Sequence, residues 1–415
     1  MGYNTEKSAS LHMRLRDALI INCVRCGEAI PCEHQKAPVS SGSRSGAYRL
    51  TTVKRYARSH KAPYKVLMPA RDGCTFKPNF SDVPSVCKSV SLQQPEIYLT
   101  ELRNVSVVGG SGVILAQDGE ALLDMAFRPR PERLDLADYG AVDVLGRTYY
   151  RAPSMARAPR IEAGIMLQAQ CGPNFYHWLI EHLSRLSLLD GVPNDWPLLV
   201  DRRVWQIPQL AEATEFYTGR PVRVLDVGVE YPVGRLAVPG PLAWLVPNLN
   251  QGIQVEPGDQ LVASEAVKFL RGTPNIQQGT RLLYINRKPR TAPRRLANED
   301  EVLSVFEEMG FEVIEPGSMT FAEQRALFAQ AAVVAGESGS GLANMLFAPQ
   351  SAVMLCLMPY EIDVSAFCDL TGHIGQRAVF IAGEVEVTGF LPYQSLYTVE
   401  TVDLKRRLKS IMAAI

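Results

Sequence analysis

The stretch VVAGESGSGLAN, residues 333–344, comes close to two motifs of phosphate and acyl chemistry and completes neither. A P-loop needs Lys and then Ser or Thr after its last glycine, to reach the terminal phosphates and hold magnesium. Leu342 and Ala343 stand there instead. A nucleophile elbow, G-x-S-x-G, would expose Ser338, but Ser340 takes the place of the final glycine. A serine hydrolase is therefore only a minor hypothesis.

The same stretch remains a candidate anion site. We expect its loop to run from Gly336 to Gly341, leaving a buried strand and entering a helix. In open α/β sheets, ligands bind at the carboxyl ends of the strands. Glycines, with Gly339 between the other two, permit positive φ and close approach of a ligand to the backbone. The amides of a helix start favour an anion, and Ser338 and Ser340 add hydroxyl donors. The alternative is a turn that only packs helix on strand.

Arginines follow the strand predicted over residues 281–287. Arg287 ends that strand, and Arg290, Arg294 and Arg295 come next in RKPRTAPRRLANE. Guanidinium groups bind phosphate through two parallel hydrogen bonds. Together with the glycine loop they would make a diphosphate site that needs no metal. The alternative is a solvated basic loop, which is what most runs of charge are.

A second set of polar residues lies in NFYHWLIEHLSRLSLLDG, residues 174–191, whose apolar spacing predicts a helix. His177 and Glu181 are four residues apart and therefore share a face, and Arg185 continues the row. A His–carboxylate pair can serve as a general base. It can equally be a solvated face, or a buried pair that only holds this half together.

Strand and helix patterns alternate with short loops, which predicts an α/β protein with doubly wound parallel sheets. A hairpin-like segment begins near Leu102, and the helix after Asn298 has that residue as N-cap. We expect four parts: an irregular N-terminal extension over residues 1–95, two α/β domains over residues 96–275 and 276–390, and a C-terminal helix packing back over residues 391–415.

The bulk composition narrows the class of protein. The 415 residues include 43 Lys plus Arg and 43 Asp plus Glu, so the net charge of zero disfavours a bulk nucleic-acid binder. We find neither a run of about 18 apolar residues nor a signal peptide, and expect a cytoplasmic protein. The eight cysteines then suggest no disulfide framework. Cys23, Cys26, Cys32 and His34 leave two options open, a structural zinc or reduced thiols in a tail.

Two blocks of the sequence resemble the family 61 glycosyltransferases, which include enzymes of capsular-polysaccharide biosynthesis. The first block is GPNFYHWLIEHLSRL, and the second runs from YINRKPRTAPRRLANEDEV through FAEQRALFAQAAVVAGESGSGLANMLFAP. With the preceding hairpin, the resemblance covers roughly residues 100–360. It implies a GT-B architecture, in which two Rossmann-like domains face each other across a cleft. It also implies inverting transfer of a sugar from a nucleotide-sugar donor, without a metal or another cofactor.

The resemblance also implies roles for individual residues. His177 and Glu181 fall on the first block, and the donor-side motif positions are Arg287, Arg295, Asn298, Gly339, Gly341 and Asn344. The implied acceptor is a glycan or a lipid-linked acceptor, and peripheral association with a membrane is a further expected contact. We place the acceptor in the domain over residues 96–275, with Asn174, Tyr176 and Arg185 as acceptor-side residues, and the nucleotide sugar in the domain over residues 276–390. One departure matters: the family has Gly-x-His-Gly-Ala-Gly in the loop, and Ser338 and Ser340 replace the His and the Ala. A catalytically degenerate protein that binds a nucleotide or glycan is therefore the alternative.

Overall fold

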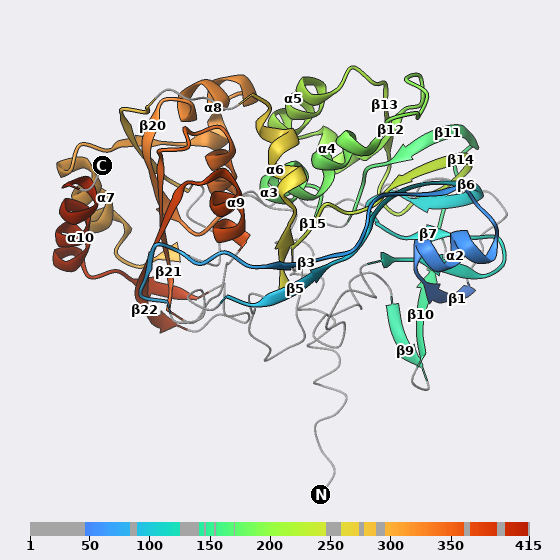
Figure 1. Cartoon of the computed structure of the whole chain (residues 1–415), viewed down its shortest axis with the longest axis horizontal. Helices are drawn as coiled ribbons and strands as arrows, with labels where there is room; N and C mark the ends of the chain where they lie inside the picture. Colours follow the sequence, from blue (N-terminus) through green and yellow to red (C-terminus); the bar gives the residue numbers. More distant parts are fainter. Residues whose placement is uncertain are drawn as a thin grey trace, which may run out of the picture.

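The protein is built as two lobes that lie side by side along its longest axis (Figure 1). The computed structural model describes residues 46–83, 89–124, 141–144, 147–152, 155–169, 171–245, 259–273, 278–287, 295–360, 366–387 and 395–413. We call residues 46–68 and 97–273 the N-lobe, residues 281–413 the C-lobe, and residues 71–94 the arm. Both lobes are mixed α/β structures in which parallel strand pairs form the centre of a sheet.

The C-lobe is organised by five parallel strands in the spatial order β19-β17-β20-β21-β22. In chain order these are strands 2-1-3-4-5, so the direction of winding reverses between β17 and β20. The strands of this lobe are β17 Arg281–Ile285, β18 Arg295–Leu296, β19 Glu312–Ile314, β20 Ala331–Glu337, β21 Val353–Pro359, β22 Arg377–Val387 and β23 Leu396–Thr398. Its helices are α7 Glu299–Glu308, η8 Pro316–Ser318, α8 Phe321–Phe328, η9 Ser340–Leu346, α9 Ala366–Ile374 and α10 Thr401–Ala413.

Local sequence explains these elements. Every residue of β20 and β21 is buried, as expected for central parallel strands covered on both faces. The helix α8 begins with a capping box, in which Thr320 and Glu323 each bond the other's backbone amide. Three acidic residues occupy the first turn of α7, where the helix dipole favours them.

The N-lobe contains a larger sheet that is only partly parallel. Its strands β13-β12-β11-β14 are parallel neighbours, and the long β6 then pairs antiparallel with β14. The strands are β1 Gly46–Thr51, β2 Tyr64–Met68, β6 Ile97–Val108, β7 Ile114–Leu115, β8 Glu120–Leu122, β9 Ala141–Val144, β10 Arg147–Ala152, β11 Ile161–Met166, β12 Leu198–Asp201, β13 Val222–Leu225, β14 Glu230–Pro239, β15 Ala243–Trp244 and β16 Leu261–Val262. The helices are α2 Val53–Ser59, α3 Phe175–His177, η5 Trp178–His182, η6 Leu183–Leu188, α4 Arg202–Trp205, α5 Pro208–Tyr217 and α6 Ser264–Arg271.

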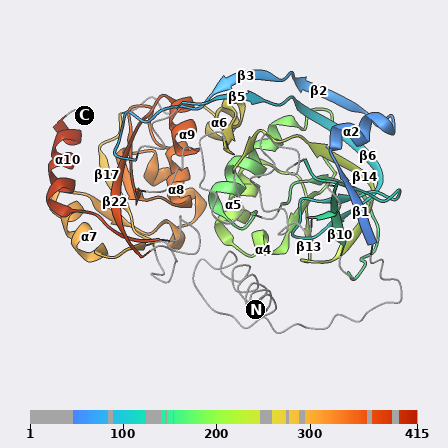
Figure 2. The ribbon, with the colours of Figure 1, turned by 90° about the horizontal axis from the view of Figure 1, so that it is seen from below.

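The arm reaches from the N-lobe to the C-lobe and back (Figure 2). Its strands β3, Arg71–Cys74, and β5, Ser91–Gln94, form an antiparallel ladder. Between them β4, Phe80–Ser81, adds a parallel strand to β22 of the C-lobe. Asp82 of the arm forms an ion pair with Arg407 of α10 at 2.7 Å. The prediction of an irregular extension was therefore wrong for residues 46–83 and 89–94, because the pairing partners of their strands lie far along the chain.

The two lobes share one hydrophobic core. A single cluster of buried side chains runs from Ile165 and Leu198 in the N-lobe to Leu283 and Met354 in the C-lobe. The C-terminal helix α10 stays on its own lobe, where it packs against α7 and adds Leu404 and Leu408 to a second cluster. None of the helices in the described ranges is long and apolar enough to cross a membrane.

Candidate functional site

The C-lobe brings Arg287 to the loop that the sequence singled out. Arg287 follows β17, and Ser338 follows β20, the strand beside it. The Arg287 guanidinium is 3.5 Å from the Ser338 carbonyl oxygen through Nη1. These two strand ends are the point where the winding order of the sheet reverses. In open parallel sheets that point is where ligands bind.

The glycines of the loop serve close packing, and the expectation of positive φ was wrong. None of them is among the described glycines with positive φ. A Cβ at Gly336 would lie 3.1 Å from the Ile285 Cβ, and one at Gly341 would lie 3.2 Å from the Ile285 Cγ2. A Cβ at Gly339 would lie 3.4 Å from the Arg287 Nε. Gly336 belongs to β20, so the loop is shorter than expected. The short distance from Gly339 shows that the Arg287 side chain lies directly over this loop.

The backbone of the loop offers fewer free donors than a long helix start would. The following η9 is a 3-10 helix of seven residues, so the argument from a helix dipole does not hold here. The Ser338 amide donates to the Leu357 carbonyl at 2.8 Å, which removes that N–H from any ligand. Ser338 is also only 1% exposed, which rules out the exposed nucleophile of a hydrolase elbow. The charge available for an anion is therefore that of Arg287.

Two predicted donor residues hold the surrounding loops in place. Asn344 is fully buried, and its Nδ2 donates to Gln324 Oε1 and to the Gly341 carbonyl. Asn298 exchanges hydrogen bonds with the backbone of Val399, through Nδ2 at 2.8 Å and Oδ1 at 3.2 Å. The Asn344 Oδ1 has no hydrogen-bond partner among the described residues. Contact of either residue with a donor stays a prediction.

Of the remaining predicted arginines, the structure describes Arg295. Arg290 and Arg294 lie outside the described residues, as does the cluster of Cys23, Cys26, Cys32 and His34. Arg295 is exposed and opens β18, which pairs with β23. The Tyr397 hydroxyl of β23 donates to Glu337 at the end of β20, so β23, which lies between β18 and β22, reaches the carboxyl side of the sheet.

The N-lobe residue His177 forms the expected pair with Glu181. Its Nδ1 lies 2.5 Å from Glu181 Oε2, and the other carboxylate oxygen accepts from the Leu245 amide at 2.6 Å. The Glu181 carboxylate thus fixes a proton on Nδ1 and leaves Nε2 as the basic nitrogen. Nε2 has no hydrogen-bond partner in the described ranges, and the His177 side chain is 15% exposed. This is the arrangement that a general base requires.

The segment that carries the pair is not the regular helix that we predicted. It is an α-turn, then the π-helix η5, then the 3-10 helix η6. Short π-helical insertions are frequent at functional sites. Glu181, His182 and Ser184 are all at most 5% exposed, so the reading of a solvated polar face was wrong. Burial lowers the pKa of His182 to about 3, which keeps this neighbour neutral.

Tyr176 and Asn174 have structural contacts of their own. Asn174 caps α3, with its Oδ1 accepting from the Tyr176 and His177 amides. Tyr176 is buried, and its hydroxyl donates to the Ala366 carbonyl of the C-lobe at 2.9 Å. The helix α3 also contacts η9, which follows the glycine loop. The pair of His177 and Glu181 is therefore anchored to the same region as Arg287.

Sequence reasoning missed an N-lobe cavity of about 400 Å³. It is lined by residues from the ends of β11 and β14, by Tyr98, Asp124 and Trp244, and by Arg185. These residues come from well-separated segments, so no local motif could indicate it.

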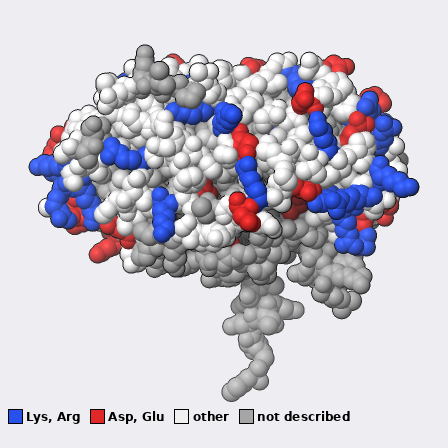
Figure 3. Space-filling view, viewed as in Figure 1, with Lys and Arg blue, Asp and Glu red and all other residues white. Residues whose placement is uncertain are grey.

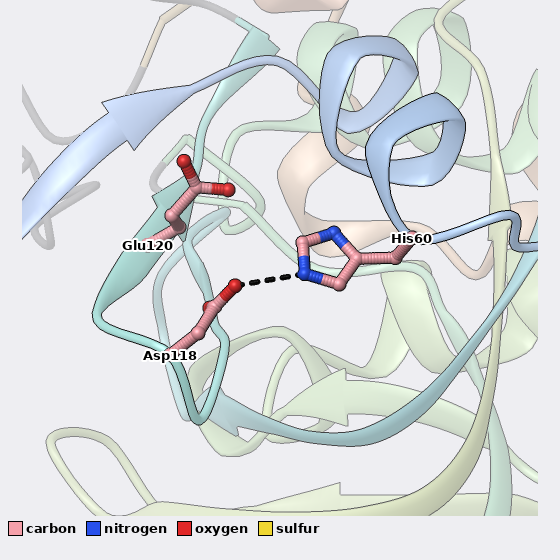
Figure 4. Close-up of side chains that lie close together, drawn as sticks. All are labelled: His60, Asp118 and Glu120. Carbon is pink, nitrogen blue, oxygen red and sulfur yellow. Dashed lines mark ion pairs between the residues drawn. The ribbon is translucent and has the colours of Figure 1, made fainter.

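A second cluster joins His60, Asp118 and Glu120 in the same lobe (Figure 4). His60 Nε2 pairs with Asp118 at 2.9 Å. The Glu120 carboxylate has an oxygen within 4.8 Å of the other two ligand atoms, and it pairs with Arg49. Because a guanidinium already occupies the Glu120 carboxylate, we interpret this cluster as a set of ion pairs.

On the face seen in Figure 3, positive and negative side chains are interspersed over both lobes.

Comparison with known families agrees with this geometry. Residues 175–355 match the model of the family Glycosyltransferase 61. This part of the chain is similar to the Glycosyltransferase 61 family. The match begins next to His177 and extends beyond the glycine loop, so it contains both halves of the candidate site. It confirms the resemblance inferred from the two sequence blocks. No curated protein sequence matches the chain.

Proposed function

We propose that the chain is an inverting, metal-independent glycosyltransferase that moves a sugar from a nucleotide-sugar donor to a glycan or lipid-linked acceptor. In this proposal the lobes act as the two Rossmann-like domains of a GT-B enzyme. The donor diphosphate lies at the carboxyl ends of β17 and β20, under Arg287. The acceptor lies on the side of His177 and Glu181.

The proposed reaction is a single displacement. His177 Nε2 accepts the proton of the attacking acceptor hydroxyl, whose oxygen forms a bond to the anomeric carbon of the donor. The bond from that carbon to the diphosphate oxygen breaks, and the leaving nucleoside diphosphate takes the electron pair. Glu181 stabilises the imidazolium that forms, and Arg287 stabilises the negative charge on the diphosphate.

The observation that supports this proposal most strongly is the position of Arg287. A guanidinium lies over the backbone of the glycine loop at the winding reversal of a parallel sheet. A guanidinium group, which can donate two parallel hydrogen bonds, suits a diphosphate at that point. The domain match from residue 175 to residue 355 independently indicates glycosyl transfer.

A panel of nucleotides and sugar nucleotides tests the proposal. We expect one of UDP, GDP or CMP, or one of their sugars, to raise the melting temperature, because a ligand that binds only the folded state stabilises it. We then expect transfer of the sugar, or slow hydrolysis of that donor, by the full chain. A chain that is stabilised by no member of the panel would contradict the donor site.

The alternative is a transferase-like binding protein. It is favoured by Ser338, which stands where the family has a histidine and is buried. Without that cationic group the leaving diphosphate has one stabilising charge less. Binding of a nucleotide with no turnover across the donor panel would support this alternative over an active enzyme.

A further inference from the structure

The N-lobe cavity lies where its parallel strands change winding order. β11 and β14 are neighbours in space, although β12 and β13 separate them in the chain. Met166, Gln168 and Ala169 at the end of β11 line the cavity. Val238, Pro239 and Pro241 at the end of β14 line its other side. This is the position in an open sheet where a ligand is expected, and a volume of about 400 Å³ is within the usual range for ligand pockets.

The walls of the cavity are mostly apolar. Tyr98, Trp244 and Ile114 contribute two aromatic rings and an aliphatic side chain, and the prolines of the β14 end add further apolar surface. Such walls suit the face of a sugar ring or a hydrocarbon chain, since both present C–H groups to aromatic and aliphatic side chains.

Four charged side chains line the cavity in the described part of the chain, and three of them have partners. Lys54 Nζ pairs with Glu96 at 2.7 Å, and Glu96 also accepts from the Tyr64 hydroxyl. Asp124 accepts from the Val53 amide at 2.8 Å and from the Tyr98 hydroxyl. The fourth, Arg185, has a buried Nε with no hydrogen-bond partner.

No carboxylate compensates Arg185 directly. Glu181 and Asp124 act on it through space, and both are committed to other hydrogen bonds. Burial accordingly lowers the pKa of Arg185. Burial also raises the pKa of Asp124. A buried guanidinium that has no ion pair is costly unless something else pairs with it.

We propose that this cavity binds an acceptor that carries one anionic group, a carboxylate or a phosphate, on an apolar or ring-shaped body, with the anion on Arg185. The assignment of the ligand as an acceptor rests on the proposed transferase function. The binding of an anion at Arg185 does not depend on that function. A uronic acid at the end of a glycan and the phosphate of a lipid carrier are two sources of the same chemistry.

The cavity begins next to the proposed base. Trp244 lines it, and the amide of the next residue, Leu245, donates to the Glu181 carboxylate that holds His177. Arg185 lies one helical turn beyond Glu181 on the same segment. An acceptor anchored on Arg185 would thus have its anion on the far side of Glu181 from His177, which leaves its other end for reaction.

Isothermal titration with two matched pairs of probes tests the proposal on the full chain. The first pair is octyl glucuronide against octyl glucoside, and the second is farnesyl phosphate against farnesol below their critical micelle concentrations. We expect at least one anionic probe to bind tenfold or more tightly than its neutral partner, and that member identifies the source of the anion. Equal affinities within both pairs, or no binding of any probe, would overturn the proposal.

Variants assign the effect to the cavity. In Arg185→Met the preference for the anion should vanish, while Arg185→Lys should retain part of it. Should Arg185→Met not fold, Ala169→Leu serves instead, because it fills the cavity and keeps the guanidinium. That variant should lose the anionic probe, and unchanged binding of the probe would overturn the assignment. Stabilisation of the protein by nucleotides, measured in parallel, distinguishes failure of this proposal from failure of the proposed function. If the anionic probe binds but no nucleotide stabilises the protein, the anion site is supported and the transferase function is contradicted.

Discussion

The two lobes place different chemistry at the same topological position. In the C-lobe, the winding reversal between β17 and β20 carries Arg287 over a tightly packed glycine loop. In the N-lobe, the reversal between β11 and β14 opens into a cavity with mostly apolar walls and one guanidinium whose Nε has no hydrogen-bond partner. The C-lobe position suits a charged group that rests on the backbone of a loop. The N-lobe position suits an apolar or ring-shaped ligand that is enclosed by side chains.

This difference suggests a division of roles. Strand order decides where a ligand can approach, since side chains at the carboxyl ends of a parallel sheet converge at the reversal. The residues that follow each strand decide what binds there. A Cβ at residue 336 or 341 would lie 3.1 or 3.2 Å from Ile285, so the packing there is tight. The β14 end instead supplies prolines that line an open volume.

The largest effect, on turnover, should come from changes at His177 and Glu181, which lie between the C-lobe loop and the N-lobe cavity. We expect His177→Ala to lower kcat by about 10²–10⁴-fold, because it removes the proposed base. Glu181→Gln should lower it less, since an amide can still accept from Leu245 but cannot stabilise an imidazolium. Steady-state kinetics with nucleotide binding as the control checks this. Full turnover in both variants would place the base elsewhere.

The next effect tests the C-lobe position. Arg287→Ala should weaken nucleotide-diphosphate binding by about 10- to 100-fold, the value of one or two charge-assisted hydrogen bonds. Arg287→Lys is the matched control and should recover part of the loss, because it keeps the charge without the fork. Titration with the nucleotide found in the panel measures both. An affinity that does not change in Arg287→Ala contradicts the proposed site.

A third effect concerns the packing beneath the loop. Gly336→Ala should destabilise the fold by about 1–3 kcal/mol, because its Cβ would lie 3.1 Å from Ile285 in a buried strand. Gly219→Ala is the control, since a Cβ there meets no atom within 4 Å. Urea unfolding compares the two. Equal stabilities would show that close packing is not what the glycine provides.

The smallest effect is a pH dependence in the N-lobe segment. The folded pKa of His182, about 3, is below its ordinary 6.5, so the unfolded state binds more protons between these values. Stability should therefore fall by about 1.4 kcal/mol for each pH unit below 6.5. In His182→Leu this loss should disappear, giving a relative gain of about 2 kcal/mol at pH 5. Melting curves at pH 5 and pH 7 that shift in parallel for both proteins would contradict it.

The sequence predicted what depends on local pattern. The alternation of buried strands and helices in the C-lobe, the spacing of His177 and Glu181, and the strand before Arg287 all follow from periodicity and position. Contacts between distant segments were not predictable in this way. The pairing of β4 with β22 and the cavity around Arg185 join residues that nothing in the local sequence relates. The π-helix at residues 178–182 was hidden because its apolar spacing resembles that of an α-helix.

The arm also has a consequence for motion. Enzymes with two lobes often rotate one against the other during turnover, and the hinge is commonly a single crossing of the chain. Here a two-stranded ribbon crosses as well, and its tip is hydrogen-bonded into the opposite sheet and ion-paired to the final helix. We expect this ribbon to limit rotation of the lobes to what bending of the paired strands β3 and β5 allows. Slow amide hydrogen exchange in β3 and β5 would then indicate that the lobes are held stiffly together.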